Sequence, residues 1–199
     1  RAPHVADRRP CAAVAMRRMD LGRGPLRTGA ARPAQRVVQF FAYIRPRRGA
    51  VDRELRRLVT PEQWALLARL SRADRAHLLE VHRRLVAEGC RDRDVLLAAL
   101  LHDVGKADGR ARTGVSQRVV SVLLGRFAPG LLTALARPDR DRWRHGLYLA
   151  REHARLGAEQ ARQAGCSERV CWLIAHHHDR AAEDPDLRLL QAADEGMGW

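Results

Sequence analysis

One apolar segment of the sequence runs directly into polar residues that could bind a metal ion. The seven apolar residues 95–101 are followed by His102-Asp103-Val104-Gly105-Lys106. At 100° per residue on a helix, His102 and Asp103 both continue the apolar stripe that would face a core. Burying an imidazole beside a carboxylate costs free energy unless a partner satisfies both, and a divalent cation does so well. The doublet therefore indicates a pair of metal ligands.

The same replacement of apolar by polar residues occurs three more times downstream. His153, His177 and Asp194 each follow apolar residues three or four positions earlier, so all three are predicted on inward faces of helices. One such residue alone is usually a hydrogen-bonded core histidine or a capping aspartate. Five His and Asp residues at the apolar seams of four helices instead favour a metal site with mixed imidazole and carboxylate ligands.

Lys106 is the only lysine among the 37 cationic residues of the chain. An ammonium group is a compact point charge, which an arginine cannot replace at a tight anion site. Beside a metal, it could neutralise a phosphate oxygen as charge builds in a transition state. Lys106 is therefore a candidate catalytic residue; the alternative is a lysine without a function in an exposed loop.

The order of these residues resembles that of the HD-domain metal-dependent phosphohydrolases, over about residues 71 to 199. The resemblance rests on an early histidine, the segment 102–106, the segment His153-Ala-Arg-Leu-Gly157-Ala-Glu159, and then His177 and Asp194. It implies one metal held by the first histidine, the doublet and Asp194, and a second metal held by the intervening histidines and bridged by Asp103. The implied metal ligands are His77, His102, Asp103, His153, His177 and Asp194. One or two divalent ions are expected, among Mn, Fe, Mg, Co, Ni and Zn, because mixed sites of this kind discriminate poorly.

Two ligand assignments have alternatives. His77 matches the family by its spacing before His102, whereas His82 lies nearer the centre of the apolar face of the same helix, so His82 is the second candidate for the first ligand. Among the histidines 176–178, neighbours diverge by 100° on a helix, and the apolar stripe selects His177. His145 is expected at the start of a surface helix.

The elements that must position these residues are helices, and the sequence predicts an all-α bundle of about eight. Capping residues mark several helix starts. The predicted helices after residue 59 are about 60–70, 71–88, 92–103, from near 116, 130–136, 143–164, 168–178 and 185–195. Gly157, inside one of them, costs roughly 1 kcal/mol relative to alanine. Close approach of a second helix would compensate for this cost and would keep His153 near the doublet.

The chain divides into three predicted parts. Residues 1–35 hold eight Arg against two Asp and lack an apolar period, which predicts a disordered basic extension. Residues 36–70 are expected to form an N-terminal helical segment that packs on the core. Residues 71–199 would form the HD phosphohydrolase domain.

The composition indicates which ligands and which cellular compartment to expect for the protein. The net charge of +14 would attract phosphate esters and nucleotides, but without a recognition helix or an aromatic-rich basic run nucleic acid is not the expected ligand. No stretch is apolar enough to predict a transmembrane segment. Four cysteines without a Cys-x-x-Cys pair favour reduced thiols and a cytoplasmic location.

The resemblance implies an enzyme that hydrolyses a nucleotide or another small phosphoester with metal-activated water, as a phosphomonoesterase or phosphodiesterase. The chain lacks the Gly-Tyr-Pro sequence of the HD-GYP branch and the Glu-Asp pair of the alarmone hydrolases, so the substrate stays open. Arg110, Arg112 and Arg118 are candidate phosphate contacts. The alternatives are a non-catalytic metal- and nucleotide-binding adaptor or sensor, and an HD-type di-iron oxygenase.

Overall fold

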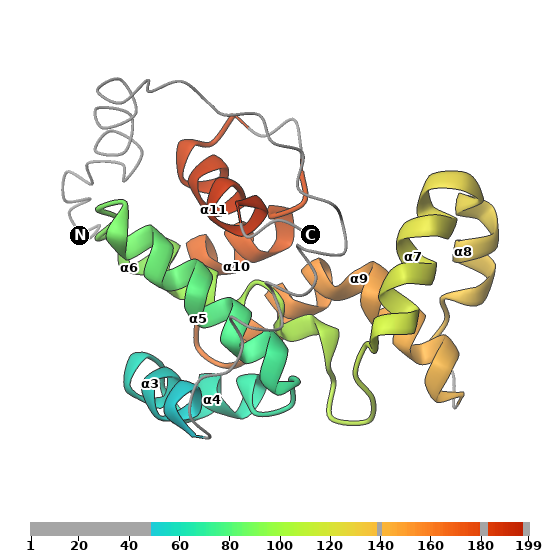
Figure 1. Cartoon of the computed structure of the whole chain (residues 1–199), viewed down its shortest axis with the longest axis horizontal. Helices are drawn as coiled ribbons and strands as arrows, with labels where there is room; N and C mark the ends of the chain where they lie inside the picture. Colours follow the sequence, from blue (N-terminus) through green and yellow to red (C-terminus); the bar gives the residue numbers. More distant parts are fainter. Residues whose placement is uncertain (1–48, 139–140, 180–182, 197–199) are drawn as a thin grey trace, which may run out of the picture.

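The computed structural model describes residues 49–138, 141–179 and 183–196, and within these ranges the protein is all-α (Figure 1). Nine α-helices and one 3-10 turn are present there, with no strand beyond an isolated bridge between Ala107 and Arg112. The first helices are α3 (Ala50–Leu58), α4 (Pro61–Leu67), α5 (Arg72–Ala87) and α6 (Arg93–Leu101), followed by η1 (Val104–Lys106). The remaining helices are α7 (Val115–Phe127), α8 (Pro129–Leu135), α9 (Arg142–Gln163), α10 (Glu168–His176) and α11 (Pro185–Glu195). The predicted fold class is confirmed. No helix in these ranges is long and apolar enough to cross a membrane.

Local capping signals fix most helix starts. The Thr60 side chain accepts a hydrogen bond from the Gln63 amide while the Gln63 side chain accepts one from the Thr60 amide, which completes a capping box. Ser71, Asp92 and Ser167 likewise accept amide hydrogen bonds from the first turns of α5, α6 and α10. Each such cap stabilises its helix by about 1 kcal/mol, which explains why these starts lie where the sequence predicts them.

The main core is built around α6, which packs against α5, α10 and α11. Because α6 is covered on several sides, nearly all of its side chains are apolar and five of its nine residues are buried. The predicted helix over 92–103 ends earlier than expected, at Leu101, and the chain continues into η1. This early end turns the residues after Asp103 toward α9.

Two glycines let η1 and α9 come into backbone contact. A Cβ atom on Gly105 would overlap the carbonyl group of His153 and would lie 2.6 Å from the amide nitrogen of Gly157. A Cβ atom on Gly157 would lie 3.2 Å from the amide nitrogen of Gly105. The close approach expected at Gly157 is therefore present, and it places His153 beside the doublet.

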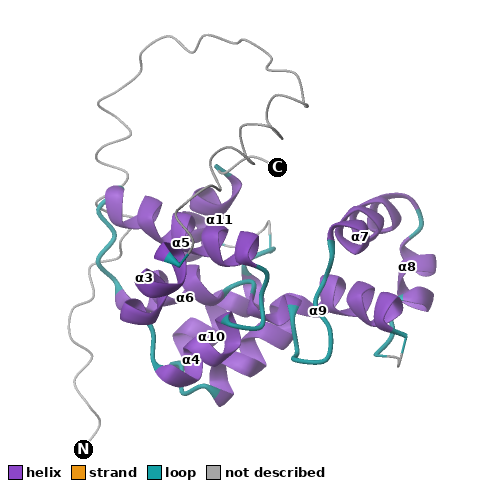
Figure 2. Ribbon diagram, turned by 60° about the horizontal axis from the view of Figure 1, so that its bottom comes forward, coloured by secondary structure: helices purple, strands orange, loops and turns teal. Residues whose placement is uncertain are grey.

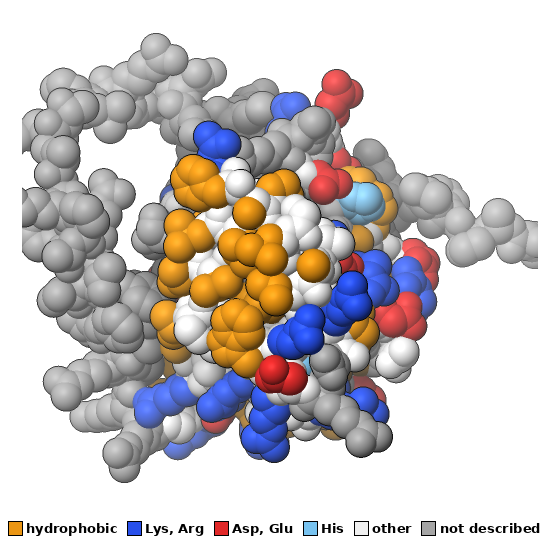
Figure 3. All heavy atoms as spheres, turned by 90° about the vertical axis from the view of Figure 1, so that its right-hand side faces the viewer, with side chains coloured by type: hydrophobic (Ala, Val, Ile, Leu, Met, Phe, Trp, Pro, Cys, Tyr) orange, Lys and Arg blue, Asp and Glu red, His pale blue; other side chains and the backbone are white. Residues whose placement is uncertain are grey.

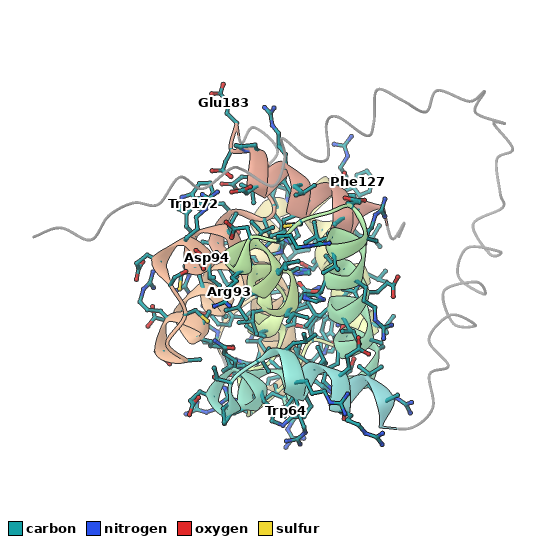
Figure 4. All side chains as sticks on the ribbon, turned by 90° about the vertical axis from the view of Figure 1, so that its left-hand side faces the viewer. Trp64, Arg93, Asp94, Phe127, Trp172 and Glu183 are labelled. Atoms are coloured by element: carbon teal, nitrogen blue, oxygen red, sulfur yellow. The ribbon has the colours of Figure 1, made fainter. Side chains whose placement is uncertain are left out.

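Helices α3 and α4 pack at one end of the main core. Val51, Leu55, Leu66 and Leu67 are buried in it. Trp64 lies at this end (Figure 4). The guanidinium carbon of Arg56 lies 4.0 Å from the centre of the Trp64 ring system. The expected extension 1–35, and the expected segment as far as residue 48, lie outside the described residues.

Helices α7 and α8 form a hairpin beside the first half of α9, away from the main core (Figure 2). A small separate cluster holds it there: Leu132, Ala136 and Leu147 are buried, and Val120 and Leu124 pack against them. No residue of α7 is itself fully buried. The hairpin is thus attached to α9 by a thin apolar contact.

Candidate metal centre

His102 and Asp103 lie at the point where α6 ends, and both are almost completely buried, with 1% and 3% of their surface exposed. The Nδ1 atom of His102 lies 3.1 Å from the carbonyl oxygen of Ala99, three residues earlier. A carbonyl oxygen only accepts, so Nδ1 carries the proton of the neutral ring and Nε2 keeps its lone pair. That Nε2 atom is buried and makes no hydrogen bond within the described residues.

The same backbone contact orients two further imidazoles. His153 Nδ1 lies 2.8 Å from the Ala150 oxygen, and His177 Nδ1 lies 2.7 Å from the Ile174 oxygen. Each ring therefore presents a lone pair on Nε2, as histidine ligands of metals usually do when the other nitrogen is held by a carbonyl. The rings of His102 and His153 both lie near the ring of His177, with centroids 5.1 and 5.3 Å from its own.

These side chains belong to two clusters that could each hold a metal ion. The first ligand group comprises His77, His102 and Asp194, and the second ligand group comprises His153, His177 and His178; in each group the ligating atoms lie within 4.8 Å of one another. In the first, His77 Nε2 is 2.9 Å from an Asp194 oxygen, and His102 Nε2 is 3.7 Å from the same atom. α5, α6 and α11 supply these residues.

Asp103 lies between the two ligand groups. One of its carboxylate oxygens is 3.8 Å from His102 Nε2, and the other is 3.6 Å from His153 Nε2. The Nζ atom of Lys106 lies 2.5 Å from the first of these oxygens. A carboxylate in this position can give one oxygen to an ion on each side.

Burial and charge set the protonation of the site. Burial lowers the pKa of His153 to about 3, with Lys106 acting in the same direction, and burial together with His102 lowers that of His177 to about 4. Burial alone would raise the pKa of Asp103, but Lys106 and the surrounding histidines outweigh it, so this pKa lies well below the ordinary value. At neutral pH, these two histidines are neutral and Asp103 is ionised, which are the forms that bind metals.

The donor set fits one or two divalent cations. It combines neutral imidazole nitrogens with carboxylate oxygens, a set that suits Mn, Fe, Co, Ni and Zn. The orphaned Nε2 atoms of His102 and His177 support the fit, because buried polar atoms normally have partners. A bound ion would satisfy them at once.

The structure brings all six sequence-predicted ligands together and separates His82 from them. His82 lies half-buried on α5 and belongs to neither ligand group within the described residues. His178, which the helical stripe did not select, joins the second group, with its Nε2 atom 2.9 Å from that of His153. The rings of His177 and His178 lie 3.9 Å apart, centre to centre, so these two neighbours reach the same ligand group.

Several neighbours of the centre differ from expectation. His145 is buried rather than exposed, and its Nε2 atom lies 2.7 Å from a carboxylate oxygen of Asp108. Arg118, a candidate phosphate contact, donates instead to Asp74, 2.6 Å away on α5. Arg110 and Arg112 remain exposed in the loop between η1 and α7. No sequence signal separated Arg118 from the other two, since its partner is 44 residues away.

Comparison with known proteins identifies the family of the chain. The family model described as HD domain matches residues 65–195, more than half of the chain. The chain therefore belongs to the HD-domain family, within the superfamily of metal-dependent phosphohydrolases. No curated protein and no solved structure matches the chain.

Proposed function

We propose that this protein is a phosphohydrolase that uses one or two divalent cations to hydrolyse a small phosphoester, with a nucleotide as the leading substrate class. The observation that carries the proposal is the position of Asp103, whose two oxygens face His102 in the first ligand group and His153 in the second. Family membership supports the reaction class.

Roles for the chain's residues follow from this arrangement. His77, His102, Asp194 and Asp103 would hold one cation, and Asp103 with His153, His177 and His178 a second. A cation bound here supplies Lewis acidity toward phosphoryl oxygens and lowers the pKa of water. In the reaction, a water oxygen would bond to phosphorus as the ester P–O bond breaks, the water would lose a proton to solvent, and the leaving oxygen would take up a proton.

Lys106 would act on the substrate directly. Its side chain is only 16% exposed and lies at the edge of the ligand groups, against Asp103. With that carboxylate holding a cation, the Lys106 ammonium group would be free to bind a phosphoryl oxygen and to stabilise its growing charge. The buried histidines, fixed by backbone carbonyl groups, would keep the ions in place without moving.

The decisive experiment measures metal content and phosphate release together. Untagged protein is analysed for metals, then assayed with Mn²⁺, Mg²⁺, Co²⁺ or Fe²⁺ against nucleotides and simple phosphoesters, as wild type, Asp103→Ala and Asp52→Ala. Asp52 is an aspartate on α3 that pairs with Arg75 and belongs to neither ligand group, so Asp52→Ala is the matched control. We expect Asp103→Ala to lose metal and phosphate release, and Asp52→Ala to keep both.

Other results would contradict the proposal in different ways. Full turnover by Asp103→Ala would remove the assigned centre. Tight nucleotide binding with metal present but no phosphate released over hours would indicate the adaptor or sensor, and iron with oxygen-dependent loss of substrate would indicate the oxygenase.

A further inference from the structure

The α7–α8 hairpin carries an apolar surface that the metal centre does not use. Ten large hydrophobic side chains are exposed in the described residues, and six of them belong to this hairpin: Val115, Val119, Val122, Leu123, Phe127 and Leu131. Three of these, Val115, Val122 and Phe127, are between 72% and 78% exposed. Figure 3 shows the hydrophobic side chains gathered on this end of the molecule. We call these six residues the apolar hairpin face.

The packing of the hairpin does not explain this face. Helix α7 is attached to α9 and α8 through the opposite side, where Val120 and Leu124 contact the small cluster around Leu132. Val119 and Val122 point elsewhere, and both are more than half exposed. An apolar face of this extent on a protruding element marks a contact with something outside the described chain.

The chain segment that carries the apolar hairpin face has basic but no acidic residues, and one of its arginines, Arg118, pairs with Asp74 of α5. Residues 109–138 contain five arginines and neither aspartate nor glutamate. At the N-terminal end of α7 lies a hollow of about 580 Å³, and the arginines that line it are Arg69, Arg110, Arg112 and Arg142. None of these four side chains forms an ion pair or hydrogen bond with another residue of the described ranges. Figure 3 shows basic side chains beside the hydrophobic ones.

We propose that the α7–α8 hairpin docks the protein on an anionic phospholipid surface. Such a surface offers a hydrocarbon layer beneath a layer of phosphate groups. The apolar hairpin face would enter the boundary between headgroups and acyl chains, while the arginines of the hollow bind lipid phosphates. Guanidinium groups bind phosphate oxygens through paired hydrogen bonds, and the four in the hollow have no ion-pair partner within the described residues.

A second copy of the chain is a poorer occupant of this face. A symmetric dimer places the same patch on both subunits, so that arginines of the acid-free segment would meet their own copies. Like charges at such an interface cost free energy. An anionic bilayer satisfies the apolar and the basic parts together.

The test measures sedimentation of the full chain with vesicles, independently of any phosphohydrolase activity. Vesicles of phosphatidylcholine alone are compared with vesicles containing 30 mol% phosphatidylglycerol, at low and high salt. We expect binding to the anionic vesicles, weakened by salt. Val122→Asp should weaken this binding about tenfold or more, and the double variant Arg110→Gln/Arg112→Gln should weaken it by about fivefold per arginine.

Ala65→Asp is the matched control, since it places the same new carboxylate on an exposed position of α4. It should weaken vesicle binding less than twofold. Circular dichroism and metal content of Val122→Asp should equal those of wild type, because Val122 is 72% exposed. Absence of binding to anionic vesicles, or equal losses in Val122→Asp and Ala65→Asp, would overturn the proposal. So would a dimer in solution that Val122→Asp dissociates, which would show a second copy on this face.

Discussion

The backbones of Gly105 and Gly157 pack directly against each other, with no room for a side chain between them. Gly105 follows Asp103 by two residues, and Gly157 follows His153 by four. This backbone contact therefore sets the distance between the carboxylate of Asp103, which lies between the two ligand groups, and the imidazole of His153 in the second group.

Replacing Gly105 by alanine tests this crossing. The new methyl group would overlap the His153 carbonyl, so α9 must shift, and we expect unfolding to become easier by about 1–3 kcal/mol. Metal content should fall because His153 moves with α9. Gly130→Ala is the control: its Cβ meets open space, so we expect stability to be unchanged or higher by up to about 1 kcal/mol. Denaturant unfolding and metal analysis measure both; equal behaviour of the two variants would contradict the prediction.

The two histidines on α5 allow a paired test of the first ligand group. His77→Ala removes a ring whose Nε2 atom is 2.9 Å from Asp194, so we expect the protein to lose one equivalent of bound metal. His82→Ala removes a ring outside both ligand groups and should retain full metal content. Elemental analysis of the two purified variants decides between them, and the reverse pattern would make His82 the ligand.

Lys106 is expected to affect turnover more than metal binding. Lys106→Met should lower kcat by about 100-fold or more, since a positive group beside the transferring phosphoryl would be lost. Lys106→Arg should not restore it, because a planar guanidinium does not fit where the ammonium lies 2.5 Å from Asp103. Kinetics at saturating metal provide the measurement. If Lys106→Met kept half of the wild-type kcat, the lysine would have no catalytic role.

The buried histidines make the metal-free protein sensitive to acid. Their folded-state pKa values, about 3 for His153 and about 4 for His177, lie below the unfolded value near 6.5. As pH falls from about 6.5 toward 4, the unfolded chain takes up protons that the folded chain refuses. The free energy of unfolding should therefore fall, by up to about 1.4 kcal/mol per pH unit for each residue.

Urea unfolding of chelator-treated protein at pH 7 and pH 5 measures this dependence of the free energy of unfolding on pH. His177→Gln should reduce the change in this free energy between the two pH values. His176→Gln, which changes a less buried histidine beside Asp179, should leave that change as it is in wild type. A wild-type stability that is independent of pH over this interval would contradict the assigned burial.

Local signals in the sequence were sufficient for much of the fold and the centre. The uninterrupted apolar run of α6 predicted a buried helix, and the polar residues at its end predicted ligands. Caps such as Ser71 and Asp92 predicted the helix starts because the hydrogen bonds involved span only two or three residues. The position of Gly157 predicted the close approach of another helix, and in the structure the 3-10 turn η1 is the segment that lies there.

Features that depend on long-range packing were not predictable in this way. Helix α5 packs against α3, α6 and α11, so its apolar face is broad, and His77 reaches the centre from an edge that periodicity did not favour. His178 lies two residues after the end of α10, and its ring lies 3.9 Å from that of His177, an approach that the helical stripe did not predict. The pairing of His145 with Asp108 joins residues 37 positions apart, and neither residue carries a local sign of the other.

The small cluster that attaches the hairpin to α9 divides the molecule into unequal cooperative units. Leu132, Ala136 and Leu147 form no part of the cluster that surrounds α6. A unit held by so few buried side chains opens at a lower free energy than the whole protein. Amide hydrogens of α7 and α8 should therefore exchange with solvent long before those of α6. The histidines at the ends of α6 and α10 would keep their positions while the hairpin opens.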